Sequence, residues 1–370
     1  MTTPCLVIDV DKIEHNTRTI VELCNSNGIE VTGVTKVTCG HPQVAKAMLR
    51  GGVSALADSR LEYIQRLINA GIDTKLKFLR LPALSSVDEV VESAALSLNS
   101  ELAVLEALSS AAQRCGKVHD VVLMVDLGDL REGIWPDDLI PVVREAIKLP
   151  GIHIKGLGTN LACFAGVMPD ADNMKRLVEL AVEVEQCFNL PMALISAVNS
   201  SGLDLIASGR MPGRVNHARI GEAILLGRET THRKPWPDTY QDAFVLHAEV
   251  LELKKKPSVP LGDRCEDAFG TRPEFQQRGE IVRALLNVGR EDINVEGLAP
   301  QDPRVIILGA SSGYLVVDVT AVAASIRVGD TLSFLMNYAA LLAAMTSGYV
   351  KKHACRGGYT GGGAISDVVS

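Results

Sequence analysis

The sequence predicts an α/β fold: a (β/α)8 TIM barrel over residues 10–230, followed by a mostly antiparallel β domain over residues 240–355. The first observation is that short apolar runs alternate with helical patterns eight times, whereas a doubly wound sheet usually stops at about five to seven strands. The second is the change after Arg228, where β-rich runs separated by Gly, Pro and Asp turns replace the helical patterns. We expect residues 1–9 to join the β domain and residues 356–370, with five glycines, to form a flexible tail.

Each expected barrel strand is an apolar run that ends in polar residues. The eight runs cover 31–36, 55–59, 76–81, 96–99, 121–127, 154–160, 194–200 and 216–222. Helical spacing predicts helices over 43–50, 60–70, 100–114, 139–147 and 173–187, with Asn99-Ser100 and Asp170 as caps. Residues 230–238 contain two prolines and are interpreted as a linker. The β domain then has strands expected over 244–253, 281–288, 305–308, 314–320 and 332–336.

Composition excludes several classes of function. Hydrophobic residues make up 47% of the chain and charged residues 22%, which indicates a globular protein with a large core. The net charge of -7 and an aromatic content of 4% argue against a nucleic-acid partner. No apolar run reaches membrane-spanning length and no signal peptide is recognisable, so we expect a soluble cytoplasmic protein. The eight cysteines are scattered and predict neither a metal site nor disulfides.

Polar residues follow several of the expected strands, and the carboxyl ends of barrel strands are where active sites of this fold form. These residues are Lys36 after the first strand, Arg131 after the fifth, Asn160 after the sixth, Asn199-Ser200 after the seventh and Arg219-Ile220-Gly221 after the eighth. A lysine at this rim can anchor pyridoxal phosphate as a Schiff base, although a solvated lysine at a strand end is the ordinary alternative. Asn199-Ser200 offers hydroxyl and N–H groups to a phosphate, or serves only as a helix cap.

In order and spacing, these segments resemble the alanine-racemase-type enzymes that depend on pyridoxal phosphate. The likeness is carried by residues 33–36 with 39–40, 57–60, 125–126 with 131–134, 198–200, and 216–221 followed by Gly227. It extends over most of residues 3–355, including 308–312 and 345–350 in the β domain. Within this group the pattern around the lysine is similar to the alanine/ornithine racemase branch.

The resemblance implies a role for each of these residues. Lys36 would carry the cofactor and, once released by substrate, act as base and acid on one face of Cα. The phosphate would be held by Asn199, Ser200, Ile220 and Gly221, with the Tyr349 hydroxyl reaching it from the β domain, and Asn160 would line the cofactor wall.

Two arginines have implied roles of their own. Arg219 would face the pyridine nitrogen, and because a guanidinium does not readily give up a proton, the ring would stay unprotonated. A weaker electron sink limits side reactions such as transamination. Arg131 would lie near the substrate carboxylate, which suits its fork of donors.

The sequence departs from the family pattern at the second acid/base. The resembled enzymes use a β-domain tyrosine of the partner subunit, but the matching stretch, residues 287–292, has Arg290 at that place. Arginine is a poor base because its pKa exceeds about 12. Either the opposite-face proton carrier has moved, with Tyr338, Tyr314 and Cys39 as candidates, or the enzyme is not a two-base racemase. We name Tyr338 as the catalytic candidate.

The sequence gives weaker indications of the substrate and of the oligomeric state than of the fold and the site. Carboxylates at Asp129, Glu132, Glu291 and Asp292 can pair with a distal ammonium, which favours ornithine, lysine or a broad range of amino acids over alanine. The rival functions are a pyridoxal phosphate-dependent decarboxylase of the same fold and a non-catalytic carrier of the cofactor. The resemblance also implies a homodimer with shared active sites.

Overall fold

The computed structural model describes residues 2–357. The chain divides into two compact units. One spans Val10–Gln241, and the other combines the residues up to Asp9 with those from Asp242 onward. The expected flexible tail, residues 356–370, lies outside the described residues from 358 on.

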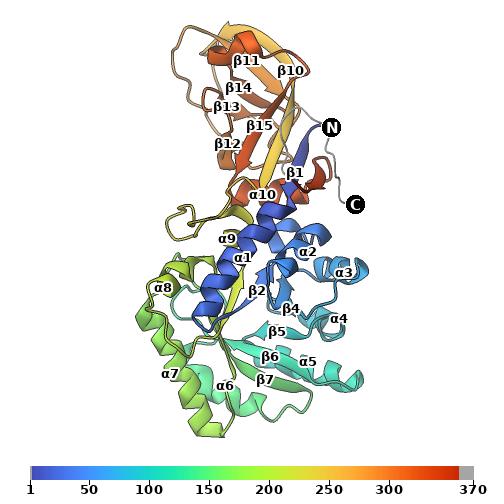
Figure 1. Cartoon of the computed structure of the whole chain (residues 1–370), viewed down its shortest axis with the longest axis vertical. Coiled ribbons are helices and arrows are strands. Elements are labelled where there is room, and N and C mark those ends of the chain that lie inside the picture. Colours follow the sequence, from blue (N-terminus) through green and yellow to red (C-terminus); the bar gives the residue numbers. More distant parts are fainter. Residues whose placement is uncertain (1, 358–370) are drawn as a thin grey trace. The chain divides into compact units, whose positions relative to one another are not determined.

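The first unit contains a closed barrel of eight parallel strands, β2 to β9, which confirms the predicted fold class (Figure 1). The barrel closes where β9 pairs with β2, with Ile220 opposite Gly33. The strands are β2 (Glu30–Val34), β3 (Ala55–Asp58), β4 (Leu76–Phe78), β5 (Leu96–Asn99), β6 (His119–Met124), β7 (Ile152–Gly158), β8 (Leu194–Val198) and β9 (His217–Ile220). Most of them end one to three residues before the predicted limits, because the polar residues at their carboxyl ends begin the loops.

Helices α2 to α8 connect successive barrel strands, α1 precedes the first barrel strand and α9 follows the last. They are α1 (Val10–Ser26), α2 (Pro42–Arg50), α3 (Leu61–Asn69), α4 (Val87–Ser93), α5 (Leu102–Arg114), α6 (Leu139–Ala146), α7 (Ala171–Phe188), α8 (Leu203–Ala207) and α9 (Glu222–Leu226). The five predicted helices are present. Helix α1 lies outside the predicted ranges although it buries Ile13, Ile20 and Cys24 along one face.

The two predicted caps had different outcomes. The Asp170 side chain accepts a hydrogen bond from the Asn173 N–H, and the Asn173 side chain returns one to Asp170, forming a capping box. The Asn99-Ser100 cap is wrong, because α5 begins at Leu102 with Glu101 as its N-cap residue. The Asn99 side chain is buried and donates instead to Ser97 in the barrel interior.

The second unit is a mostly antiparallel sheet in the order β12-β15-β10-β11-β14-β13 (Figure 1). Its strands are β10 (Phe244–Pro257), β11 (Glu280–Leu286), β12 (Leu298–Pro300), β13 (Ile306–Ala310), β14 (Leu315–Asp318) and β15 (Thr331–Met336). Strand β1 (Cys5–Asp9) pairs antiparallel with β10 and parallel with β16 (Lys351–Cys355). This half is mostly strand, as expected, but it also contains the nine-residue helix α10 (Tyr338–Thr346), which was not predicted because its Ala- and Leu-rich sequence shows little helical periodicity.

Among residues 2–357, no helix is both long enough and apolar enough to cross a membrane.

Candidate active site

Lys36 directly follows the carboxyl end of β2. Thr35 holds the end of this strand to β3 through its N–H, which donates to the Ala57 carbonyl at 3.0 Å. Lys36 then begins a short 3-10 turn, η1 (Lys36–Thr38), and has an exposed side chain. The turn ends at Cys39, which has a left-handed backbone conformation (φ 53°) and donates its N–H to the Lys36 carbonyl. The tight turn therefore fixes the backbone from which the lysine side chain extends.

A buried carboxylate, Asp58, supports this turn from the end of β3. It accepts a hydrogen bond from the Thr35 hydroxyl at 2.6 Å and another from the Ser59 N–H at 2.6 Å. Burial raises the pKa of Asp58 to about 6, although these hydrogen bonds and the charge of Lys36 oppose the shift. Asp58 was not predicted to have a role, because a buried strand-end aspartate has no sequence signature that separates it from a solvated one.

Replacing Asp58 with asparagine should remove a pH dependence from the stability of the protein. The folded pKa of about 6 is above the ordinary aspartate pKa of 3.8, so this group stabilises the fold at low pH and the stabilisation is lost as the pH rises through about 6. The free energy of unfolding of the wild type, relative to that of Asp58→Asn, should fall by on the order of 2–3 kcal/mol between pH 4 and pH 7. Denaturant titrations across this range measure the difference. A constant difference would contradict the raised pKa.

Arg219 lies on β9 with its side chain buried in the barrel. Its two terminal nitrogens donate to the Ser196 carbonyl at 2.8 Å and the Thr159 carbonyl at 2.7 Å. Within residues 2–357 no carboxylate forms an ion pair with Arg219, so the guanidinium does not serve an ordinary structural ion pair. Burial lowers the pKa of Arg219 to about 10, and the nearby charges of Glu132 and Arg131 also act on it. A buried guanidinium held by carbonyl groups retains its positive charge for a bound group.

The loops after β7 and β8 are tied together by Asn199. Its side-chain nitrogen donates to Asn160 Oδ1 at 3.1 Å and to the Leu161 carbonyl at 2.8 Å. Its side-chain oxygen accepts the Ser201 N–H at 2.8 Å, so Asn199 does cap the following turn. The turn is the 3-10 helix η4 (Ser200–Gly202), followed only by the five-residue α8, so the expected contribution of a helix dipole is small. An anion bound at this turn would therefore be held by hydroxyl and backbone N–H groups.

The loops after β8 and β9 also meet. The Ser200 hydroxyl accepts the Ala223 N–H at 3.1 Å, which joins η4 to the start of α9. Gly221 precedes α9 and lies against the end of β2, because a Cβ atom there would be 3.1 Å from the Val34 carbonyl oxygen. The ends of β2, β8 and β9 therefore meet at the small residues Ser200 and Gly221, which we call the cradle.

The loop after β6 presents Arg131. Asp126 shapes this loop by accepting the Gly128 N–H at 2.8 Å and the Leu130 N–H at 3.2 Å. Gly133 has a φ of +143°, and a Cβ atom there would collide with the backbone of Asp126, so the position requires glycine. Arg131 is exposed and donates to Glu132 at 2.6 Å. The loop thus offers a cationic and an anionic side chain next to each other.

Asp129 has a structural role that corrects its suggested role as an ammonium partner. Its buried carboxylate accepts backbone N–H groups from three residues of the loop after β7, namely Cys163 at 3.2 Å, Phe164 at 2.8 Å and Val167 at 3.1 Å. Both oxygens are therefore occupied, and they join this loop to the loop that carries Arg131.

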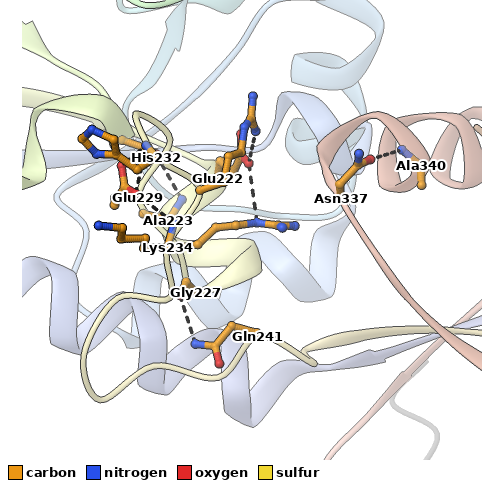
Figure 2. A network of polar contacts seen from close by, with 12 residues as sticks. Glu222, Ala223, Gly227, Glu229, His232, Lys234, Gln241, Asn337 and Ala340 are labelled. Carbon is orange, nitrogen blue, oxygen red and sulfur yellow. Dashed lines mark hydrogen bonds and ion pairs between the residues drawn. The ribbon is translucent and has the colours of Figure 1, made fainter. Parts of the chain in front are cut away.

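The segment predicted as a linker, residues 230–238, follows α9 and is held by hydrogen bonds to Glu229 (Figure 2). The buried Glu229 carboxylate accepts N–H groups from Thr231, His232 and Lys234 at 2.6–3.0 Å. Asp204 joins Glu229 and His232 in a group whose possible metal-ligand atoms lie within 4.8 Å of one another. Because both Glu229 oxygens already accept backbone hydrogen bonds, this group carries no metal assignment.

The remaining candidate residues belong to the β unit. Arg290 pairs with Glu296 at 2.8 Å and its guanidinium lies 5.3 Å from the centre of the Phe269 ring, so it is engaged in structural contacts. Asp292 is buried and accepts the Ser347 hydroxyl at 2.6 Å, which argues against its proposed pairing with a substrate ammonium.

The two tyrosines assigned from the sequence flank one helix of the β unit. Tyr338 is the first residue of α10 and is half-buried, next to Asn337, whose side chain accepts the Ala340 N–H at 2.9 Å (Figure 2). Tyr349 follows this helix and is exposed. Their catalytic and phosphate-binding roles stay predictions.

Comparison with known proteins decides the family. A family model described as the N-terminal domain of alanine racemase matches residues 8–229. The chain belongs to the alanine racemase family. An ornithine racemase from Acetoanaerobium sticklandii is 41% identical, with 94% of this chain and 99% of the relative covered. A lysine racemase from Thermotoga maritima is 37% identical, with 95% and 98% covered.

Solved structures of the family share the fold of the whole chain. An alanine racemase from Bacillus anthracis has a TM-score of 0.73 at 18% identity and covers 99% of this chain and 97% of its own. One from Clostridium difficile has a TM-score of 0.70 at 20% identity, with 96% and 97% covered. The prediction of an amino-acid racemase that uses pyridoxal phosphate is confirmed by these family matches, which do not favour the decarboxylase or the non-catalytic carrier.

The residues at the barrel rim fit pyridoxal phosphate. Arg219 is a buried charge without a carboxylate partner among residues 2–357, and the Thr159 hydroxyl behind it is buried without a hydrogen-bond partner. The cradle at Ser200 and Gly221 has no space beside Val34 for a larger side chain at position 221. An aromatic nitrogen facing Arg219 and a phosphate in the cradle would suit these features, with Lys36 extending from the neighbouring strand.

Proposed function

We propose that this racemase interconverts the L and D forms of a basic amino acid, ornithine or lysine, at a site formed by Lys36, Arg131, Arg219 and the cradle at Ser200 and Gly221. The observation that carries the substrate class is the Arg131–Glu132 pair, because it offers opposite charges side by side at the mouth of the barrel. The high identity to an ornithine racemase and a lysine racemase supports the same class.

The proposed roles divide between binding and proton transfer. Pyridoxal phosphate, when bound, withdraws electrons from the substrate and makes its Cα–H acidic. Lys36 takes and returns the proton on one face of Cα. Arg131 binds the α-carboxylate, and Glu132 receives the distal ammonium of the side chain.

Two further residues are proposed to control the protonation of the cofactor ring and proton transfer on the second face of Cα. Arg219 keeps its own proton, since its pKa of about 10 remains well above neutral pH, and so offers none to the ring nitrogen that faces it. Tyr338 is our candidate for the acid and base on the opposite face of Cα, supplied by the partner subunit of a homodimer. The cytoplasmic location stays a prediction.

Replacing Glu132 with glutamine should change substrate preference. Glutamine keeps an acceptor for Arg131 but loses the negative charge, so kcat/KM for ornithine should fall about tenfold while kcat/KM for alanine changes less than twofold. Initial rates of racemisation on both amino acids measure the effect. Glu145→Gln is the control, because Glu145, on α6, forms an exposed ion pair with Lys148, which follows the helix.

Two outcomes would contradict the proposal. Equal losses on both amino acids would mean that Glu132 acts only through Arg131. Faster turnover of alanine than of ornithine or lysine by the wild type would overturn the substrate class itself.

A further inference from the structure

A chain of buried polar side chains crosses the interior of the barrel and ends at Arg219. Lys77, on β4, has its ammonium nitrogen 2.8 Å from the Thr32 hydroxyl and 2.9 Å from His217 Nε2, and the Thr32 hydroxyl also lies 2.8 Å from His217 Nε2. The other ring nitrogen of His217, Nδ1, is 2.7 Å from the Ser196 hydroxyl. Ser196 in turn accepts a hydrogen bond from an Arg219 terminal nitrogen at both its hydroxyl and its carbonyl.

The chemistry of these groups sets the direction of the hydrogen bonds. A lysine ammonium has donors only, so His217 accepts at Nε2 and must carry its proton on Nδ1. Lys77 keeps its charge at neutral pH, because burial lowers its pKa only to about 8. Burial first, and then the charges of Lys77 and Arg219, hold the pKa of His217 well below its usual range, so the ring is neutral. His217 therefore donates to Ser196, whose hydroxyl oxygen accepts from both His217 and Arg219.

The arrangement is costly for a purely structural core. Two cations, Lys77 and Arg219, are buried in one barrel, and within residues 2–357 neither forms an ion pair with a carboxylate. Burying an unpaired charge is unfavourable, and groups of this kind concentrate at functional sites. No other part of the proposed mechanism uses Lys77, His217 or the Ser196 hydroxyl.

We propose that Lys77, His217 and Ser196 form a positioning relay, which fixes the guanidinium of Arg219 in the orientation that faces the cofactor ring. The proposal rests on the role of Arg219 proposed above and extends it to residues that do not touch the substrate. With Nδ1–H of His217 directed at Ser196, the serine hydroxyl is held in place as an acceptor for Arg219. Loss of the relay would let the guanidinium rotate within the barrel and weaken its contact with the ring.

The barrel supplies a matched control. Ser97, on β5, is also buried, and its hydroxyl lies 2.9 Å from His119 Nε2. The contacts of this second serine–histidine pair do not include Arg219. Ser97→Ala and Ser196→Ala therefore remove the same group from the same kind of environment.

The test compares holoenzymes by the absorbance spectrum of the bound cofactor and by the rate at which it dissociates. Half-transamination between the amino acid and the cofactor yields a keto acid and pyridoxamine phosphate. We also measure the amount of these two products per racemisation event, which is the transamination ratio. Ser196→Ala should shift the spectrum and raise the dissociation rate and the transamination ratio about tenfold, the effect expected from one hydrogen bond to a charged group. Ser97→Ala should leave all three at wild-type values.

Variants of Lys77 distinguish an effect on the orientation of Arg219 from a general loss of protein stability. Lys77→Gln keeps a donor for His217 and should resemble the wild type, whereas Lys77→Met leaves only the Thr32 hydroxyl at His217 Nε2 and should change all three readouts in the same direction as Ser196→Ala, by a smaller factor. If Ser196→Ala changes nothing, or if Ser97→Ala changes the spectrum equally, the relay is refuted while racemisation by the wild type still supports the proposed function. A wild type that shows neither a bound-cofactor band nor racemisation would refute the proposed function instead.

Discussion

Replacing Lys36 with alanine will abolish racemisation and the absorbance band of covalently held cofactor. Lys36 follows β2 at the barrel rim and is proposed both to carry the cofactor and to move the proton at Cα, so one substitution removes two functions. Positioned proton transfer alone contributes a factor of about 10²–10⁴, and we expect a loss of at least about 10³-fold. Initial rates with ornithine and an absorbance spectrum measure the two effects.

Lys75→Ala is the control for this experiment. Lys75 is exposed and precedes β4, at the amino-terminal end of a barrel strand and away from the catalytic rim. Its replacement should leave both the spectrum and the rate unchanged. A Lys36→Ala protein that keeps a tenth of the wild-type rate would show that another residue moves the proton.

The second large effect is expected from Arg219→Glu. Burial raises the pKa of a carboxyl group, so a glutamate in this position would hold a proton and share it with the ring nitrogen. The ring would become a stronger electron sink, and the share of turnovers that end in transamination should rise. Racemisation should fall about 10²–10³-fold, the usual cost of removing a preorganised charge. Both are measured by chiral analysis of the amino acid and by quantifying keto acid.

Arg219→Lys provides the comparison, because it keeps the positive charge but loses the fork that contacts Ser196 and Thr159. It should lose activity without a comparable rise in keto acid. If Arg219→Glu racemises within tenfold of the wild type and forms no keto acid, Arg219 does not control the ring nitrogen.

The sequence predicts the fold because barrel strands and helices have strong, repeated patterns. Lys36 and Arg219 could be placed at one rim from the strand count, since parallel strands in a barrel point the same way. The structure brings their strands together through the pairing of β2 with β9. Helix α1 was not predicted, because polar Asn16 and Thr17 lie on its buried face and interrupt the apolar spacing.

Other features depend on contacts that no local pattern reveals. Asp129 was a candidate for substrate binding from its place in a loop, but its partners lie 34 to 38 residues further along the chain. Lys77 and His217 are 140 residues apart and meet only because the barrel closes. In the sequence, Lys77 and His217 stand out only as polar residues within apolar strands, and this pattern does not reveal which residue each one contacts.

Racemisation of a basic amino acid through proton transfer at Cα is tested by incubating L-ornithine with the wild-type protein and pyridoxal phosphate in heavy water. We expect the product to approach equal amounts of D- and L-ornithine, with deuterium at Cα in the newly formed enantiomer, and Lys36→Ala to abolish both changes. Product that remains entirely L while gaining deuterium, or release of carbon dioxide with formation of the diamine, would contradict this expectation.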